Sequence, residues 1–476
     1  MSQIVRRYSC IWIAAVSSTA IAQSASEQAG EWKLAQAAAP ADQPKSTEAP
    51  AAATKPAEAT PPPAAASETP VTSGWNGEHF FVRSSDGKFQ LQPVGYFNAN
   101  YTVYSGDAAP PDGFRIARAR FGFQGSYTSS IDWVLQSDIT ATGISVRDAY
   151  VHLRPIKELQ FTIGQFKVPF SQEVGLGDTN VEFTERSIVG VLYPDANGSY
   201  RSPGAMVHGD LFESTVQYYL GAFNGRGILA PATSNQPEIV ARLRLWPGKL
   251  TGIDALKRLA IGGSTALGRV TGISGDTSFS GTINDGSFAF FPSFRINGPT
   301  QRWNAELLWL WGPFGVHAEY IESHQARESV GAEAVQGGGL ETLPTIVGKG
   351  GYVQLTYFLT GETQDENLPP KVKRPVFGAF TPGGEKEYGF GGISLRARFS
   401  YLEGNAPGAT FPTLTPTSIP SYYDHTQQWA FGINWYLNYW TLYKIDLNVD
   451  QLLNPSVQGS LPQTYFVVLQ QIQFRF

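Results

Sequence analysis

The sequence is poor in cysteine, in charge and in long apolar runs. It contains 476 residues but a single cysteine, Cys10, so an intrachain disulfide and a cluster of thiolate metal ligands are both excluded. Only 16% of the residues are charged, compared with about 25% in typical soluble proteins. No stretch reaches the roughly 18 consecutive apolar residues that a transmembrane helix requires. A barrel of short strands, in contrast, is compatible with this composition.

Catalytic and cofactor motifs are also lacking. The six histidines are scattered, and His317 with His324 lacks the spacing of a zinc-binding HExxH helix. Neither a G-x-S-x-G nucleophile elbow nor a phosphate-binding P-loop occurs. The sequence therefore predicts no enzyme activity, no cofactor and no metal site. A barrel hydrolase that uses serine and histidine is kept as an alternative.

The N-terminus has the pattern of a secretory signal peptide. Arg6 and Arg7 precede an apolar stretch too short to span a membrane, and Ala20-Ile21-Ala22 supplies a small-x-small cleavage pattern. We therefore predict a signal peptide over residues 1–22. Cys10 lies before the apolar stretch, which argues against a lipid-attachment cysteine, and cleavage would remove it.

Residues 23–73 differ in composition from the rest of the chain. They are rich in alanine and proline, as in the run TPPPAAA at 60–66. Such segments cannot bury enough apolar surface to offset the entropy lost on ordering. We predict a disordered spacer on the periplasmic side over 23–73 and one membrane domain over 74–476.

Apolar and polar residues alternate in many short segments of this second part. In the last strand, Phe474 and Phe476 share one parity, whereas Gln473 and Arg475 share the other. Because side chains alternate between the two faces of a strand, one face is apolar and the other polar. The same alternation recurs in 314–323 and in 440–450.

This pattern predicts an all-β fold, a transmembrane antiparallel β-barrel of sixteen or eighteen strands. About seventeen candidate strands occur, and bacterial single-chain barrels have even strand numbers. A soluble β-sandwich would alternate in the same way. The signal peptide and the terminal aromatic Phe476 favour the membrane, as do aromatics that suit interfacial girdles. These aromatics are Trp309, Trp311, Trp429, Trp435, Tyr436, Tyr439 and Trp440.

Three predicted strands each carry an Arg-x-Arg pair whose members share a face. An arginine on the lipid face near the midplane costs roughly 2–4 kcal/mol, so we expect the pairs to line the lumen. Their guanidinium groups suit phosphate and carboxylate groups, and this arrangement predicts a preference for anions. The pairs are Arg118 with Arg120, Arg242 with Arg244, and Arg396 with Arg398.

An alternative is that carboxylates of the lumen neutralise these arginines. Asp148, Glu319, Asp446 and Asp450 have lumen parity and could pair with them. The result would be a transverse field across the pore with little selectivity. We place anion preference first because three separate strands repeat the arginine pattern.

Several segments resemble the phosphate-selective porins O and P. The similarity covers residues 88–476 and is carried by the following motifs: FRIARARFGF at 114–123, DAYV at 148–151, IGQFKVPFS at 163–171, GAFNG at 221–225 and WAFGINWYLN at 429–438.

The resemblance implies a homotrimer of sixteen-stranded barrels, each narrowed by an inward-folded third loop. It implies that residues 171–202 form this loop and that Lys167 lies at the constriction, whereas the alternative for Lys167 is a solvated strand end. Arg186 and Arg201 would face the same constriction or fix the loop through ion pairs. The 171–202 segment has five carboxylates and no lysine, which departs from a phosphate site built on lysines.

We therefore expect a passive diffusion channel for small anions such as phosphate, located in the bacterial outer membrane. Its partners would be outer-membrane lipid and small anions, with no nucleic acid. A weakly selective general or carbohydrate porin is the main alternative.

Overall fold

The computed structural model describes most of the chain from Val71 onward, and all described residues belong to one unit, Ser67–Phe476. The predicted signal peptide and residues 23–70 of the predicted spacer lie outside the described residues. Among the described residues, no helix is long and apolar enough to cross a membrane. The described ranges are 71–76, 79–105, 109–140, 143–194, 200–232, 234–271, 281–283, 288–291, 294–331, 341–376, 389–407, 423–455 and 462–476.

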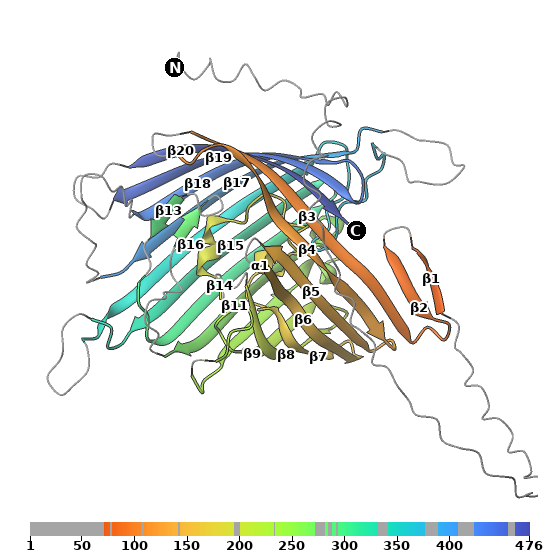
Figure 1. Cartoon of the computed structure of the whole chain (residues 1–476), viewed down its shortest axis with the longest axis horizontal. Helices are drawn as coiled ribbons and strands as arrows, with labels where there is room; N and C mark the ends of the chain where they lie inside the picture. Colours follow the sequence, from red (N-terminus) through yellow and green to blue (C-terminus); the bar gives the residue numbers. More distant parts are fainter. Residues whose placement is uncertain are drawn as a thin grey trace, which may run out of the picture. The chain divides into compact units, whose positions relative to one another are not determined.

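Sixteen strands of the described part form a closed antiparallel barrel (Figure 1). Each strand pairs with the next along the chain, and β20 returns to β3, from Phe466 opposite Ser105 to Arg475 opposite Tyr96. The strands are β3 (Phe89–Ser105), β4 (Gly113–Tyr127), β5 (Ile131–Thr140), β6 (Gly143–Ile156), β7 (Leu159–Lys167), β8 (Arg201–Leu211), β9 (Val216–Phe223), β10 (Glu238–Leu245), β11 (Leu259–Val270), β14 (Gly298–Trp311), β15 (Phe314–Arg327), β16 (Leu343–Phe358), β17 (Gly392–Asn405), β18 (Tyr423–Tyr436), β19 (Thr441–Pro455) and β20 (Gln463–Arg475).

Two hairpins are not part of this ring of strands. β1 (Val71–Trp75) pairs with β2 (Phe80–Ser84), and the pairing of β2 with β3 is limited to Val82 and Arg83. β12 (Gly281–Ile283) and β13 (Phe288–Phe291) form a separate two-stranded sheet. The sixteen-stranded prediction is therefore confirmed for the barrel. Because β1 begins at Val71, the last three residues of the predicted spacer lie in a strand.

The predicted alternation is present along the barrel wall. On β19, Leu447 exposes 41% of its surface, whereas Lys444 and Asp446 each expose 1%. The apolar face points outward, as lipid requires, and the polar face points into the barrel. Tyr436 is an exception to the predicted girdle, since it is buried and packs against Phe358 on the inner side.

The connections differ between the two ends of the barrel. At one end most are short turns, such as the one between Tyr127 and Ile131, and we call this the turn end. The connection from β16 to β17 also lies at the turn end but is long, running from 359 to 391. At the opposite end, the loop end, lie the longer connections, including the one between β7 and β8.

The β7–β8 connection folds into the barrel, and we call its described residues 168–194 the inner loop. It contains α1 (Gln172–Gly175) and the 3-10 helix η2 (Ile188–Leu192), and Figure 1 shows α1 within the ring of strands. The side chains of Phe170, Val189 and Leu192 are fully buried in one apolar cluster. This cluster also includes Val240, Ile321, Ile346 and Leu402 of the barrel strands. Apolar burial thus holds the loop against the wall.

Hydrogen bonds also join the inner loop to the barrel strands. The backbone N–H of Glu173 donates to Glu319 (2.7 Å), and that of Thr184 donates to Asp446 (2.6 Å). Lys444 donates to the carbonyl of Val181 (2.7 Å). The loop is therefore fastened to β15 and β19, and its other edge faces β3 to β6.

Candidate permeation site

Two cavities border the inner loop. The larger, of about 620 Å³, includes Tyr439 and Phe476 in its lining and so opens towards the turn end. The smaller, of about 230 Å³, includes Ile139 and Thr140 and lies towards the loop end. Arg120 and Asp178 line both cavities. These two side chains therefore mark the place where the cavities meet.

Cations outnumber carboxylates around the two cavities. Among the described residues, seven cationic side chains line them, against four carboxylates. The cations are Arg118, Arg120, Arg147, Lys167, Arg186, Arg201 and Arg475, and the carboxylates are Asp138, Asp148, Asp178 and Glu185. A positive lining raises the local concentration of small anions.

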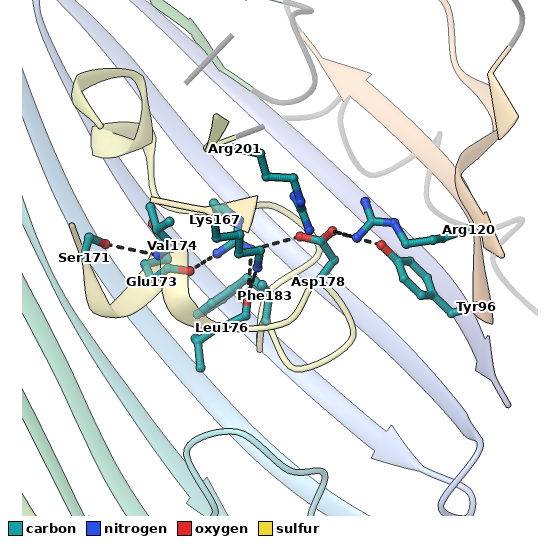
Figure 2. Close-up of polar contacts among 12 residues, drawn as sticks. Tyr96, Arg120, Lys167, Ser171, Glu173, Val174, Leu176, Asp178, Phe183 and Arg201 are labelled. Carbon is teal, nitrogen blue, oxygen red and sulfur yellow. Dashed lines mark hydrogen bonds and ion pairs between the residues drawn. The ribbon is translucent and has the colours of Figure 1, made fainter. Parts of the chain in front are cut away.

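Asp178 bridges the inner loop and the barrel wall. Its Oδ2 lies 3.1 Å from a guanidinium nitrogen of Arg120 on β4 and accepts a hydrogen bond from the Tyr96 hydroxyl on β3 (2.9 Å). Its Oδ1 accepts from Arg186 of the same loop (2.9 Å). Figure 2 shows this carboxylate pointing at Arg120 and Tyr96. Asp178 thus joins three elements at the boundary between the cavities.

The ionisation of Asp178 is controlled by these neighbours. Burial by itself raises the pKa of the carboxyl group, because the charged form loses hydration. The nearby charges of Lys167, Arg120, Arg118 and Arg186 outweigh burial and hold the pKa of Asp178 well below its usual value. The group is therefore a carboxylate at neutral pH.

Two further cations, Lys167 and Arg201, lie at the larger cavity. Lys167 ends β7, and its ammonium group donates to the carbonyl of Leu176 in the inner loop. Arg201 begins β8 and makes a bidentate pair with Asp148, with both distances at 2.9 Å. Both side chains line the larger cavity. Lys167 is therefore not a fully solvated strand end, and Arg201 fixes the wall while it faces the cavity.

Arg186 has contacts that fix the loop. Besides Asp178, its guanidinium group donates to the carbonyls of Glu173 and Leu176. It also lines the smaller cavity. Arg186 thus fixes the loop, as one of the two expectations had it, and its side chain also reaches the smaller cavity.

A β-bulge positions the first arginine pair. Asn98 of β3 lies opposite Arg118, but the next residue, Ala99, lies opposite Ile116, so Ala117 is left over. The extra residue reverses the alternation. Ile116 therefore points outward and is exposed, although it shares the parity of Arg118 and Arg120. Both arginines line the smaller cavity.

The other two pairs face the interior but do not line these two cavities. Arg242 and Arg244 both contact Glu306, at 2.7 and 2.9 Å, and Arg244 also contacts Glu366 at 2.7 Å. Arg242 and Arg244 lie on the wall away from the meeting point of the cavities. Their charge is balanced locally by the two glutamates.

The third pair lies beneath the inner loop. Arg396 pairs with Asp446 at 3.0 Å, and Arg398 lies 3.8 Å from Glu173. Arg398 also donates to the backbone carbonyls of Glu185 and Arg186. These two arginines thus fasten the loop to β17.

The carboxylates predicted to neutralise arginines have mixed roles. Asp148 and Asp446 do pair with arginines. Glu319 instead receives hydrogen bonds from the inner loop, from Asn304 and from Tyr352, and Asp450 accepts from Gln428.

The sequence reasoning missed other partners of the arginines. Asp138 and Glu306 lie on strands with inward parity, so alternation could have indicated them. Asp178 and Glu366 lie in connections, where no periodicity exists to indicate a face. Among the described residues, no group of three or more histidine, cysteine, aspartate or glutamate side chains could hold a metal ion.

Comparison with known families identifies this architecture. A family model for "Phosphate-selective porin O and P" matches residues 89–251 and 281–451. The chain belongs to this family. The porin family consists of channels, so the prediction that the protein is not an enzyme is confirmed. As a porin it is a protein of the bacterial outer membrane, where membrane lipid and small solutes are its partners.

One solved outer membrane protein has a similar fold, and two further channel structures give slightly lower scores. OmpT, an outer membrane protein of Vibrio cholerae, superposes with a TM-score of 0.50 at 10% identity, over 82% of this chain and 98% of that chain. An anion-selective porin from Comamonas acidovorans gives 0.49 at 12% identity, over 82% and 100%. The outer membrane channel DcaP of Acinetobacter baumannii gives 0.49 at 11% identity, over 83% and 99%. No curated protein matches the sequence.

Proposed function

We propose that this porin conducts small anions, phosphate among them, by passive diffusion past the meeting point of the two cavities. The observation that carries the proposal is the excess of cations over carboxylates around those cavities. Arg118, Arg120 and Arg147 would guide an anion from the loop end. Lys167 and Arg201 would receive it towards the turn end. No chemical step and no cofactor are involved.

The test is electrical recording of the purified porin in a planar bilayer under a KCl gradient, followed by addition of phosphate. We expect a reversal potential of anion sign and a chloride current that phosphate reduces. Anion selectivity without any effect of phosphate would retain anion conduction and reject phosphate as a solute. A reversal potential of cation sign would contradict the proposal, because the carboxylates would then dominate.

A pair of arginine variants tests the location of the path. Arg118→Gln removes a cation that lines the smaller cavity, and we expect the anion-to-cation permeability ratio to fall roughly twofold or more. Arg242→Gln is the matched control, since Arg242 faces the interior and pairs with Glu306 but lines neither cavity. We expect its ratio to stay close to wild type. A larger effect from Arg242→Gln would move the path away from Arg118.

A second candidate is the passage of neutral sugars, which aromatic rings in the larger cavity favour. The rings of His152 and His208 stack at 5.0 Å, and the stack continues from His208 to Tyr219 at 5.7 Å. Flat rings offer an apolar surface to the faces of a sugar. Swelling of liposomes in solutions of neutral sugars would support this candidate if the reversal potential were close to zero.

We also propose a homotrimer, which the family resemblance implies. Cross-linking of the porin in native outer membranes should give a species of three chains. A single-chain species under conditions that cross-link a known trimeric porin would contradict the proposal.

A further inference from the structure

The Asp178 carboxylate has the surroundings of a bound anion. Its two oxygens lie within 3.1 Å of two guanidinium groups and a tyrosine hydroxyl. Charged hydrogen bonds of this kind are the ones that a carboxylate or a phosphate would receive from arginine. Tyr96 of β3 and Arg186 of the inner loop donate hydrogen bonds to the Asp178 carboxylate, and Arg120 of β4 forms an ion pair with it, so the chain supplies an anion site.

This anion site lies between the two cavities. Asp178 lines both cavities, and the Arg120 guanidinium with which it pairs does the same. The remaining cations near the carboxylate, Lys167 and Arg118, act on it through space. An anion that crosses from one cavity to the other therefore meets Arg120 while this arginine is paired with Asp178.

The inner loop holds Asp178 in place. Arg186 donates to Asp178 and also to the carbonyl of Leu176, two residues earlier in the chain. The N–H of Asn180 donates to the carbonyl of Gly177, which closes a tight turn around Asp178. Because the carboxylate is attached to a fixed loop, its effective concentration at the site is high compared with that of a free ion.

We infer that Asp178 is a tethered anion that competes with the permeating anion for Arg120, and so sets how tightly this porin retains phosphate. The inference rests on the proposed anion conduction. Conduction requires that a solute be attracted to a site and also leave it. By occupying the cations, Asp178 weakens the site, so an anion passes by brief displacement of the carboxylate rather than by stable binding.

The first test is Asp178→Asn, recorded in a planar bilayer with chloride current and increasing inorganic phosphate. Removing the charge while keeping the size should lower the phosphate concentration that halves the current about tenfold or more, equivalent to about 1.4 kcal/mol. The reversal potential should also shift further in the anion direction. An unchanged phosphate dependence in this variant overturns the inference.

Glu366→Gln is the matched control. Glu366 is also a carboxylate inside the barrel that pairs with an arginine, and its side chain is 14% exposed compared with 10% for Asp178. It lines neither cavity. We expect its phosphate dependence to equal that of wild type. An equal change in both variants would indicate a general charge effect and would overturn a specific role for Asp178.

A cysteine variant separates charge from loosening of the loop. Asp178→Cys can be modified with a sulfonate-bearing or a trimethylammonium-bearing thiosulfonate, which gives adducts of opposite charge on the same backbone. The sulfonate should restore weak phosphate block, and the ammonium should strengthen the block. Equal behaviour of the two adducts would overturn the inference. Wild-type porin treated with both reagents controls for reaction at any other site.

The two proposals can fail separately in these recordings. A reversal potential of cation sign in the wild-type porin would contradict anion conduction, whatever the result for Asp178→Asn. A reversal potential of anion sign in the wild-type porin, with the same phosphate dependence in Asp178→Asn, would support anion conduction and reject the role of Asp178 as a tethered anion.

Discussion

At the scale of single residues, several arginines in the interior of this porin pair with carboxylates, which come from barrel strands and from the inner loop. Arg120 contacts Asp138 of the neighbouring strand and Asp178 of the inner loop. Arg242 and Arg244 share Glu306, and Arg396 meets Asp446. Ion pairs inside a barrel hold their partners in one geometry, and removing one partner leaves a charge without compensation. The location of a charge relative to the cavities, rather than its presence, then decides its effect on a solute.

The pKa of Asp178 gives a prediction of pH dependence. Because the folded pKa lies well below the usual value, the bridge to Arg120 is fully present above the ordinary aspartate pKa of about 3.9. It should be lost only as the pH falls through the lower, folded value. Arg186, which also faces the carboxylate, keeps its charge over this range.

We therefore expect that Asp178 does not titrate between pH 7 and about pH 4.5, and that it causes no pH-dependent change in chloride conductance in this window. The measurement is single-channel conductance of wild-type porin and of Asp178→Asn at matched pH. A step in wild-type conductance within this window, absent from the variant, would show that Asp178 has an ordinary or raised pKa and would contradict the prediction.

At the scale of the elements, the alternation of the sequence predicted the strands and their faces because a strand has a fixed period of two. It therefore indicated the inward direction of Lys444 and Asp446 and the outward direction of Leu447. It failed at Ala117, where the bulge reverses the period. The alternation could not predict the carboxylates that the arginines meet from the connections. Asp178 and Glu366 lie in connections whose path depends on packing inside the closed barrel.

The outward face of β19 gives a prediction of stability. Leu447 lies in the middle of this strand and is exposed on the lipid side, so Leu447→Arg should lower the free energy of unfolding by about 2–4 kcal/mol. Thr441→Arg is the control at the same face at the turn end of the strand, where the cost should be about 0–1 kcal/mol. Denaturant unfolding in lipid vesicles measures both. Equal costs would mean that Leu447 does not lie near the bilayer midplane.

At the scale of the whole molecule, the barrel depends on its first and last strands meeting. β20 pairs with β3 over ten residues, and the backbone of Phe476 exchanges hydrogen bonds with Gly95 at 2.9 and 3.1 Å. Closure leaves no strand edge without a partner in lipid, which the hydrocarbon layer demands. The inner loop, the ion pairs and the two cavities all depend on this closure, because they are built from residues on opposite walls.

Gly95 is the residue at which closure can be tested. A β-carbon at this position would lie 2.7 Å from the carbonyl oxygen of Arg120 and 2.5 Å from the ring of Phe476. The backbone oxygen cannot move without disturbing the β3–β4 pairing, so Gly95→Val should destabilise the barrel by about 1–3 kcal/mol or more. Gly113→Ala is the control, since nothing lies within 4 Å of a β-carbon there. Heat-dependent migration on SDS gels should show that Gly95→Val unfolds at a lower temperature while Gly113→Ala matches wild type. A barrel that tolerates valine at position 95 would mean that β3 and β20 can separate locally, and that closure is less tight than the contacts of Phe476 indicate.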